Sequence, residues 1–199
     1  MCICILFKMS ETILLIGNGG REHAILERLI LSKAVEKVIV CNNTYWDKPF
    51  HFKPEYSKVE NHTLEDTSIS SYIHFAKENK VGLVIVGPEK YLAEGIIDEF
   101  AKQEIMCFGP TKAMAQIETS KAYGKEIMHK LDLPTAEFRI YSTKDVAKEF
   151  LIDNIGNGYQ VIKKDGLAGG KGVMVLKDAT HQSLTKGLNY LDEIYEEDE

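Results

Sequence analysis

The chain has 199 residues, 44% of them hydrophobic, which allows a substantial core and is typical of an ordinary soluble protein. Its formal net charge of −6 comes from the end of the chain, where six of the last eight residues are acidic; without these six, acidic and basic residues number 24 each. The rest of the chain is therefore neutral and lacks the excess of basic residues that nucleic-acid binding favours, so we expect no nucleic-acid partner. We expect residues 192–199 to form a solvated acidic tail.

The cysteines and the N-terminus bear on location. Cys2, Cys4, Cys41 and Cys107 form neither a C-x-x-C pair nor a zinc-ligand spacing, which favours free thiols in a reducing, cytoplasmic compartment and no metal site made by this chain. Residues 1–8 are an apolar extension without the basic start or the length of a signal peptide or membrane span, so no membrane partner is expected. Translation could start at Met9.

Short β-rich runs alternate with helical periodicity through the first half of the chain. The pattern predicts strands at Ile13–Ile16, Lys37–Cys41, Leu83–Val86 and Ile105–Phe108. It predicts helices at Glu22–Leu31, from Ile69 to Ala76 and from Leu92 to Phe100, and leaves the polar stretch after Cys41 without a strand. This alternation indicates an α/β fold with a parallel, Rossmann-like sheet.

A glycine-rich loop lies directly between the first strand and the first helix, from Gly17 to Arg21. Glycines let backbone amides approach a ligand, a helix N-terminus favours an anion, and Arg21 adds a bidentate donor, so the loop predicts a phosphate-sized anion site. A dinucleotide site is disfavoured, because Glu22 replaces the third glycine of that fingerprint and Asn42 and Asn43 follow the second strand in place of an acidic residue.

Three loops follow strands of the predicted sheet, at Gly17–Arg21, Gly87–Glu89 and Gly109–Thr111. Since ligands bind at the carboxyl edge of such sheets, the three loops could face one crevice. Each Gly-Pro pair taken alone is better explained as a simple chain reversal, and it is their shared edge that favours a site.

The pattern changes after Thr111, and we expect a second domain at 111–191 after a first one at 9–110. Helices are predicted at Lys112–Glu118 and Lys121–Leu131, then a strand at Glu137–Tyr141. The run from Ser142 to Asp145 has the pattern of a capping box for the next helix.

A second glycine-rich loop joins predicted strands at Gln160–Lys163 and Val173–Leu176 in a hairpin. It is not a Walker loop, because Lys171 is followed by Gly172 and a strand, whereas a Walker motif opens a helix. Its four glycines and neighbouring lysines favour a mobile cover over phosphates, although an exposed hairpin tip is the plainer alternative.

Several motifs occur in an order that resembles one enzyme family. They are Gly17 to Ala24, Gly87-Pro-Glu89, Phe108 to Thr111, Ser120-Lys-Ala122, Leu133 to Glu137 and the loop from Lys163 to Val173. The region from Met9 to Leu191 is similar to the N-terminal part of the phosphoribosylamine–glycine ligases, ATP-grasp enzymes of purine synthesis. The resemblance implies a pre-ATP-grasp domain followed by a partial ATP-grasp domain.

The resemblance also implies an activity and site residues. Such a ligase activates glycine with ATP as glycyl phosphate, which the amine of 5-phosphoribosylamine then attacks to give glycinamide ribonucleotide. The residues implied for phosphoribosylamine are Gly17, Asn18, Gly19, Gly20, Arg21, Glu22, His23, Gly87, Pro88 and Glu89. Those implied for ATP are Lys121, Lys163, Asp165, Gly166, Gly169, Gly170, Lys171 and Gly172. No catalytic residue is assigned.

The sequence departs from the family at two places. Cys41 to Asp47 replaces the usual Pro-Gly-Asn-x-Gly loop. The sequence also stops before the adenine hinge and the ligands for Mg²⁺ or Mn²⁺, so we expect this chain alone to be inactive, with a C-terminal fragment or fused later-pathway domains as partners. Two alternatives stay open: another ATP-grasp ligase, such as a biotin carboxylase-like enzyme, and a non-catalytic nucleotide- or phosphosugar-binding module.

Overall fold

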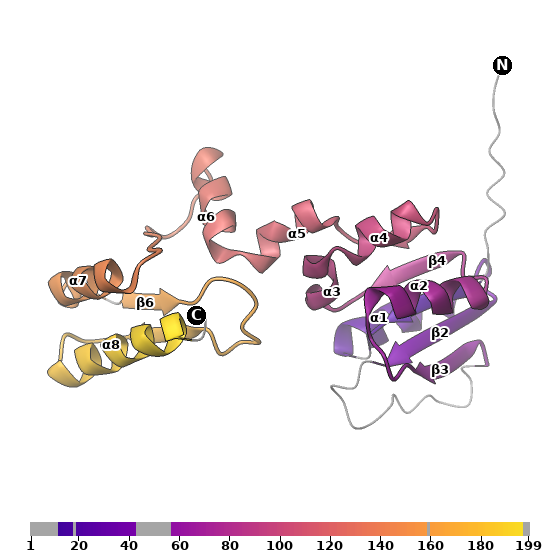
Figure 1. The fold of residues 1–199 in the computed structure, drawn as a ribbon, viewed down its shortest axis with the longest axis horizontal. Coiled ribbons are helices and arrows are strands. Elements are labelled where there is room, and N and C mark those ends of the chain that lie inside the picture. Colours follow the sequence, from indigo (N-terminus) through magenta and orange to yellow (C-terminus); the bar gives the residue numbers. More distant parts are fainter. Residues whose placement is uncertain (1–11, 18, 43–56, 159, 197–199) are drawn as a thin grey trace, which may run out of the picture. The chain divides into compact units, whose positions relative to one another are not determined.

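The computed structural model describes residues 12–17, 19–42, 57–158 and 160–196, in two compact units divided between Ala115 and Gln116 (Figure 1). The first unit contains β1 (Thr12–Ile16), α1 (Gly20–Leu29), β2 (Lys37–Asn42), β3 (Val59–Thr63), α2 (Ile69–Glu78), β4 (Leu83–Val86), α3 (Glu89–Glu94), α4 (Ile96–Lys102) and β5 (Cys107–Phe108). Helix α5 (Lys112–Thr119) crosses the division. The second unit contains α6 (Lys121–Lys130), α7 (Lys144–Asn154), β6 (Gln160–Lys163), β7 (Val173–Leu176) and α8 (His181–Glu196).

The first unit is built on a parallel sheet with the strand order β3-β2-β1-β4-β5. The chain runs outward from β1 through β2 to β3, then returns to β4 on the other side of β1. The topological switch point of the sheet therefore lies between β1 and β4, whose last residues, Ile16 and Val86, are in register. Ligands of open α/β sheets collect at such a point, and the α/β prediction is confirmed.

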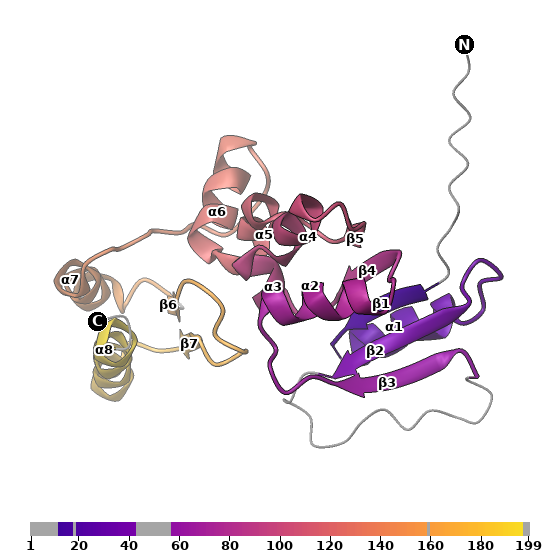
Figure 2. The ribbon, with the colours of Figure 1, turned by 45° about the vertical axis from the view of Figure 1, so that its right-hand side comes forward.

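Helices cover both faces of this sheet because successive strand residues point to opposite sides. Leu14 and Ile16 of β1 face Tyr72 of α2 and Phe100 of α4. On the other face, Leu15 packs in a cluster with Leu26 of α1 and Val38. Figure 2 shows α1 and α2 on the two sides of the sheet.

Two strands of this sheet differ from the sequence prediction. Strand β3 was not predicted, because Val59–Thr63 is a polar edge strand in which only His62 and Val59 are partly buried, and the His62 ring stacks on Phe75 at 4.4 Å between centroids. Strand β5 is shorter than the predicted Ile105–Phe108, because only Cys107 and Phe108 pair with β4.

In the second unit the antiparallel hairpin β6–β7 packs on α7 and α8. The predicted hairpin is thus confirmed. Its core contains Ala147 and Leu151 of α7, Leu176 of β7 and Leu191 of α8. Alternation along the strands leaves Val161 and Val175, which pair across the hairpin, half exposed on the other face.

Three predictions for this unit are wrong. Residues 137–141 form no strand, since the described residues provide them with no ladder partner, and a strand requires one. The capping box predicted from Ser142 to Asp145 does not form, because α7 begins after Thr143, whose side chain makes no capping hydrogen bond. The acidic tail does not begin at 192, because α8 continues to Glu196 and Lys148 Nζ donates to Asp192 Oδ1 at 2.6 Å; residues 197–199 lie outside the described residues.

Candidate functional site

The first glycine loop begins at the switch point of the sheet. Gly17 is buried, its φ is +105°, and a Cβ there would lie 2.8 Å from Cγ of Pro88. Only glycine combines that backbone angle with that close approach. The Gly17 amide donates to the Cys41 carbonyl at 3.0 Å, which ties the loop to the end of β2.

Glu22 lies underneath this loop. The residue is 5% exposed, and it is the one buried charged residue within the described ranges. Oε2 accepts a 2.6 Å hydrogen bond from the Gly19 amide, and a Cβ added at Gly87 would lie only 1.8 Å from Oε1. The structure therefore brings Gly19, Glu22 and Gly87 together but turns the Glu22 carboxylate inward.

Arg21 lies at the rim of the same site. Its Nη1 donates to the Gly87 carbonyl oxygen and lies 3.5 Å from Glu89 Oε2. Both contacts use a single nitrogen, and the Arg21 side chain is 63% exposed, so the guanidinium stays accessible to an anion. Arg21 thus joins the Gly17–Arg21 and Gly87–Glu89 loops, as sequence reasoning expected of their shared edge.

The remaining residues predicted near this loop lie in different places. Gly20 opens α1 with free space around it, whereas Asn18 lies outside the described residues. His23 Nε2 is 3.4 Å from Glu27 Oε1, one turn along the helix. Gly109 of the third loop packs against Ile97 of α4.

The second glycine loop is fastened to the start of α6 by Asp165. Its Oδ2 accepts from the Ser120 hydroxyl at 2.9 Å and its Oδ1 from the Ala122 amide at 3.1 Å. Lys121 Nζ donates to the Gly166 carbonyl at 2.7 Å. The structure therefore joins two motifs that are about 45 residues apart in sequence. Sequence reasoning did not assign Ser120 to the site, although a serine immediately before a helix is a capping signal.

The charge of Asp165 is favoured by this arrangement. Partial burial raises the pKa of its carboxyl group, but hydrogen bonds from the Ala122 amide and the Ser120 hydroxyl, with further backbone donors, outweigh burial and leave the pKa below its usual value. The folded-state pKa is thus below the unfolded one, so this attachment is complete above about pH 4 and is lost as the pH falls through the folded pKa.

We expect the amide resonance of Ala122 to move with a midpoint below 3.8 when the chain is titrated from pH 6 to pH 2 and followed by NMR. The shift should disappear in Asp165→Asn, which cannot ionise. A midpoint above 3.8, or an unchanged titration in the variant, would show that Asp165 does not hold α6 as described.

Lys163 and Lys171 flank the loop at its two ends. Both are exposed, and Lys163 ends β6 on the face that also carries Val161 and Val175. The Lys171 carbonyl accepts from Tyr190 Oη of α8 at 3.4 Å. Two exposed lysines therefore lie beside the backbone amides of the loop, and this is the donor set that phosphates prefer.

Glycines shape this loop in two ways. Gly166, Gly169 and Gly170 have φ values of +82°, +53° and +81°, and a Cβ added at any of them would meet no atom within 4 Å, so they supply backbone conformation in open space. Gly172 is buried, and a Cβ there would lie 2.5 Å from Cβ of Ala168. The Lys164 amide donates to its carbonyl at 2.9 Å and closes the base of the loop.

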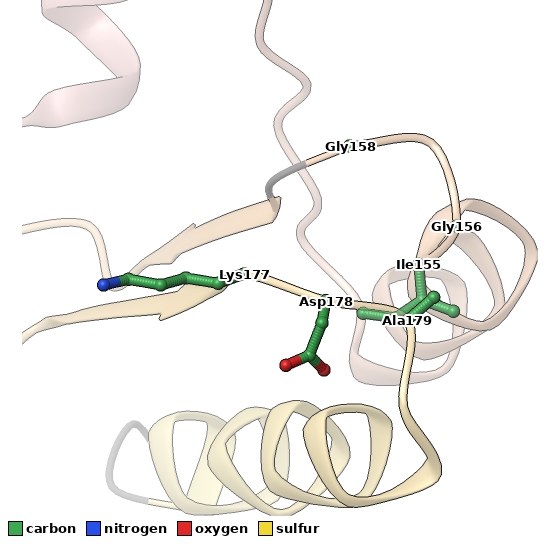
Figure 3. Close-up of a pocket in the computed structure, with 6 residues that line it drawn as sticks. All are labelled: Ile155, Gly156, Gly158, Lys177, Asp178 and Ala179. Carbon is green, nitrogen blue, oxygen red and sulfur yellow. The ribbon is translucent and has the colours of Figure 1, made fainter.

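A hollow of about 240 Å³ lies at the opposite end of the hairpin, lined by Ile155, Gly156, Gly158, Lys177, Asp178 and Ala179. Figure 3 shows the Lys177 side chain extending away from the Asp178 carboxylate. Asp178 Oδ1 accepts from the Thr180 hydroxyl at 2.6 Å and from the Ser183 hydroxyl at 2.5 Å, at the start of α8. The polar groups around this hollow do not converge on a point where a ligand could bind, so the second glycine loop is the better candidate site.

A metal ion is not accommodated by the residues that the structure describes. Within those ranges no three His, Cys, Asp or Glu side chains gather in a group that could hold one. The carboxylate of the second glycine loop, Asp165, is already bound by Ser120 and Ala122.

Among the residues that the structure describes, no helix has the length and apolar character needed to cross a bilayer.

Comparison with known sequences identifies relatives of both units. The N domain of phosphoribosylglycinamide synthetase matches residues 11–118, and the ATP-grasp (A) domain of that synthetase matches residues 119–198. The chain is 40% identical over 163 residues to a phosphoribosylamine–glycine ligase of Haemophilus influenzae and 38% identical over 168 residues to one of Allochromatium vinosum. These alignments cover 82% and 83% of this chain but 36% and 37% of the relatives, so the chain spans a little over a third of their length.

Solved structures share the fold at low sequence identity. A biotin carboxylase–β,γ-ATP complex from Campylobacter jejuni matches with a TM-score of 0.67 and 19% identity, over 93% of this chain and 42% of that one. A D-alanine–D-alanine ligase from Bacillus anthracis matches with a TM-score of 0.57 and 16% identity, over 92% of this chain and 54% of that one. Together with the match of residues 119–198 to an ATP-grasp (A) domain, this likeness in fold confirms the predicted fold class.

Proposed function

We propose, since this chain belongs to the phosphoribosylglycinamide synthetase family, that it supplies the N-terminal part of an enzyme that ligates glycine to 5-phosphoribosylamine at the expense of ATP. Residues 9–110 would form the pre-ATP-grasp domain, with the site for the phosphosugar at the first glycine loop. Residues 111–191 would hold the triphosphate. The 40% identity to a phosphoribosylamine–glycine ligase favours this over the biotin carboxylase-like alternative, which is similar in fold at 19% identity.

The proposed reaction has two steps. A carboxylate oxygen of glycine attacks the γ-phosphorus of ATP, the bond to the bridging oxygen breaks, and ADP leaves with glycyl phosphate formed. The amine of phosphoribosylamine then attacks the carbonyl carbon, phosphate leaves, and the amine loses a proton as the amide forms. The acyl phosphate makes the carboxylate oxygen a good leaving group, which a free carboxylate lacks.

The observation that carries the proposal is the attachment of the second glycine loop to α6. Asp165 binds Ser120 and Ala122, and Lys121 binds Gly166, so the lysine of one motif is brought to the loop of the other. Lys121 and Lys163 then provide positive charge for a triphosphate, and the loop amides provide donors. For the phosphosugar, Arg21 and the first amides of α1 provide the corresponding donors.

The divalent cation that ATP-grasp enzymes use is not assigned to residues of this chain. The described residues do not offer a set of ligands for it, so no step here is routed through it. We propose that its ligands belong to a part of the enzyme outside residues 1–199.

The function is tested by measuring ADP formation that depends on both glycine and phosphoribosylamine. We expect none from the 199-residue chain alone and turnover when the C-terminal part of a family member is added. Turnover by the chain alone would contradict the proposed division of labour. Binding of ATP and ribose 5-phosphate without turnover in the mixture would favour a non-catalytic binding module.

A further inference from the structure

We propose that Glu22 is a positioning residue that clamps the two loops at the switch point of the sheet and so places the amides that bind the sugar phosphate. The inference rests on the proposed function for the identity of the ligand. It concerns a residue that the family resemblance places only within a substrate-binding motif.

A hydrogen bond joins Glu22 to the first glycine loop. The Gly19 amide donates to Oε2 at 2.6 Å, so that amide is already used and is not free for a phosphate. Gly19 is also the residue that precedes α1, and having no side chain it cannot cap the helix itself. Among the described residues, the first amides of α1, those of Gly20 and Arg21, have no hydrogen-bond acceptor, so they can serve as donors at the exposed end of the helix.

Glu22 also packs against the loop that follows β4. A Cβ at Gly87 would lie 1.8 Å from Oε1 and 2.4 Å from Cδ of Glu22, so the carboxylate occupies the space that any other residue would fill. Gly17 makes the parallel contact, with Pro88 2.8 Å from a Cβ placed on it. The two loops thus interlock around one buried side chain.

Burial of the charged Glu22 side chain costs free energy. A carboxylate is seldom buried unless it is bound, because burial costs free energy that hydrogen bonds must offset. Glu22 is 5% exposed and lies at the edge of the sheet where a ligand is expected, so its burial serves the geometry of the loop. Arg21 makes a second link between the same loops through the Gly87 carbonyl.

The test compares Glu22→Ala, Glu22→Gln, Gly87→Ala and the double variant Glu22→Ala/Gly87→Ala in the 199-residue chain. Calorimetric titration uses ribose 5-phosphate, a stable substitute for phosphoribosylamine, with ATP as the internal control for the other unit. We expect Glu22→Ala to weaken ribose 5-phosphate binding by about 10-fold or more, consistent with loss of a charged hydrogen bond, and to leave ATP binding unchanged. Glu22→Gln keeps an oxygen that can accept from Gly19 and should restore most of the affinity.

Thermal unfolding of these four variants and of the unmodified chain tests the clamp without any ligand. Gly87→Ala should lower the melting temperature when Glu22 is present and have a much smaller effect when Glu22 is alanine, because the collision is then removed. Additive effects of the two substitutions, or a Glu22→Ala variant that binds ribose 5-phosphate as the unmodified chain does, would overturn the proposal. Failure of the unmodified chain to bind ribose 5-phosphate would instead count against the proposed function, and the unfolding data would still decide whether Glu22 is a clamp.

Discussion

Replacing Lys163 with alanine is expected to weaken ATP binding by about 10- to 100-fold, the effect of losing one charge-assisted contact to a phosphate. Lys163 ends β6 where the glycine loop begins, and its side chain is exposed. The fold should be unaffected, because the substitution removes no buried side chain. Titration of ATP into the 199-residue chain measures the change directly.

Lys177→Ala is the matched control for this experiment. Lys177 is also an exposed lysine of the hairpin region, but it follows β7 at the end opposite the glycine loop. Another lysine of this unit, Lys144, would be a poorer control. Its Nζ lies 3.3 Å from Asp192 Oδ1, so replacing it would disturb an ion pair. Equal ATP affinity of the Lys163 and Lys177 variants would remove Lys163 from the site.

Replacing Arg21 with alanine should weaken ribose 5-phosphate binding by about 10- to 100-fold, since it removes a guanidinium donor at the rim and the link to the Gly87 carbonyl. Arg21→Lys keeps the charge but not the planar fork, so we expect an intermediate loss. ATP binding should not change in either variant. Calorimetric titrations with both ligands distinguish the two sites.

Arg28→Ala is the corresponding control, because Arg28 is an exposed arginine in the last turn of the same helix, away from the glycine loop. If Arg28→Ala and Arg21→Ala weakened ribose 5-phosphate binding equally, the effect would be one of overall charge. A loss confined to Arg21 supports a local contact.

Local pattern was sufficient for most of the elements. The runs at β1, β2 and β4 are strongly apolar and bounded by glycine or polar residues, and each forms a strand in the structure. Strand β3 escaped prediction because an edge strand needs few apolar residues. Residues 137–141 show the opposite case: strand-like composition does not make a strand where the described chain offers no neighbour to pair with.

The sequence by itself determined the motifs, the α/β class and the two glycine loops, because these depend on residue type and short spacings. Only the tertiary structure decided what the motif residues face. It turned Glu22 inward beneath Gly19 and Gly87, and it joined Asp165 to Ser120 across 45 positions. The physical reason is that a side chain's direction in a loop is set by the partners that folding brings to it, and those partners are distant in sequence.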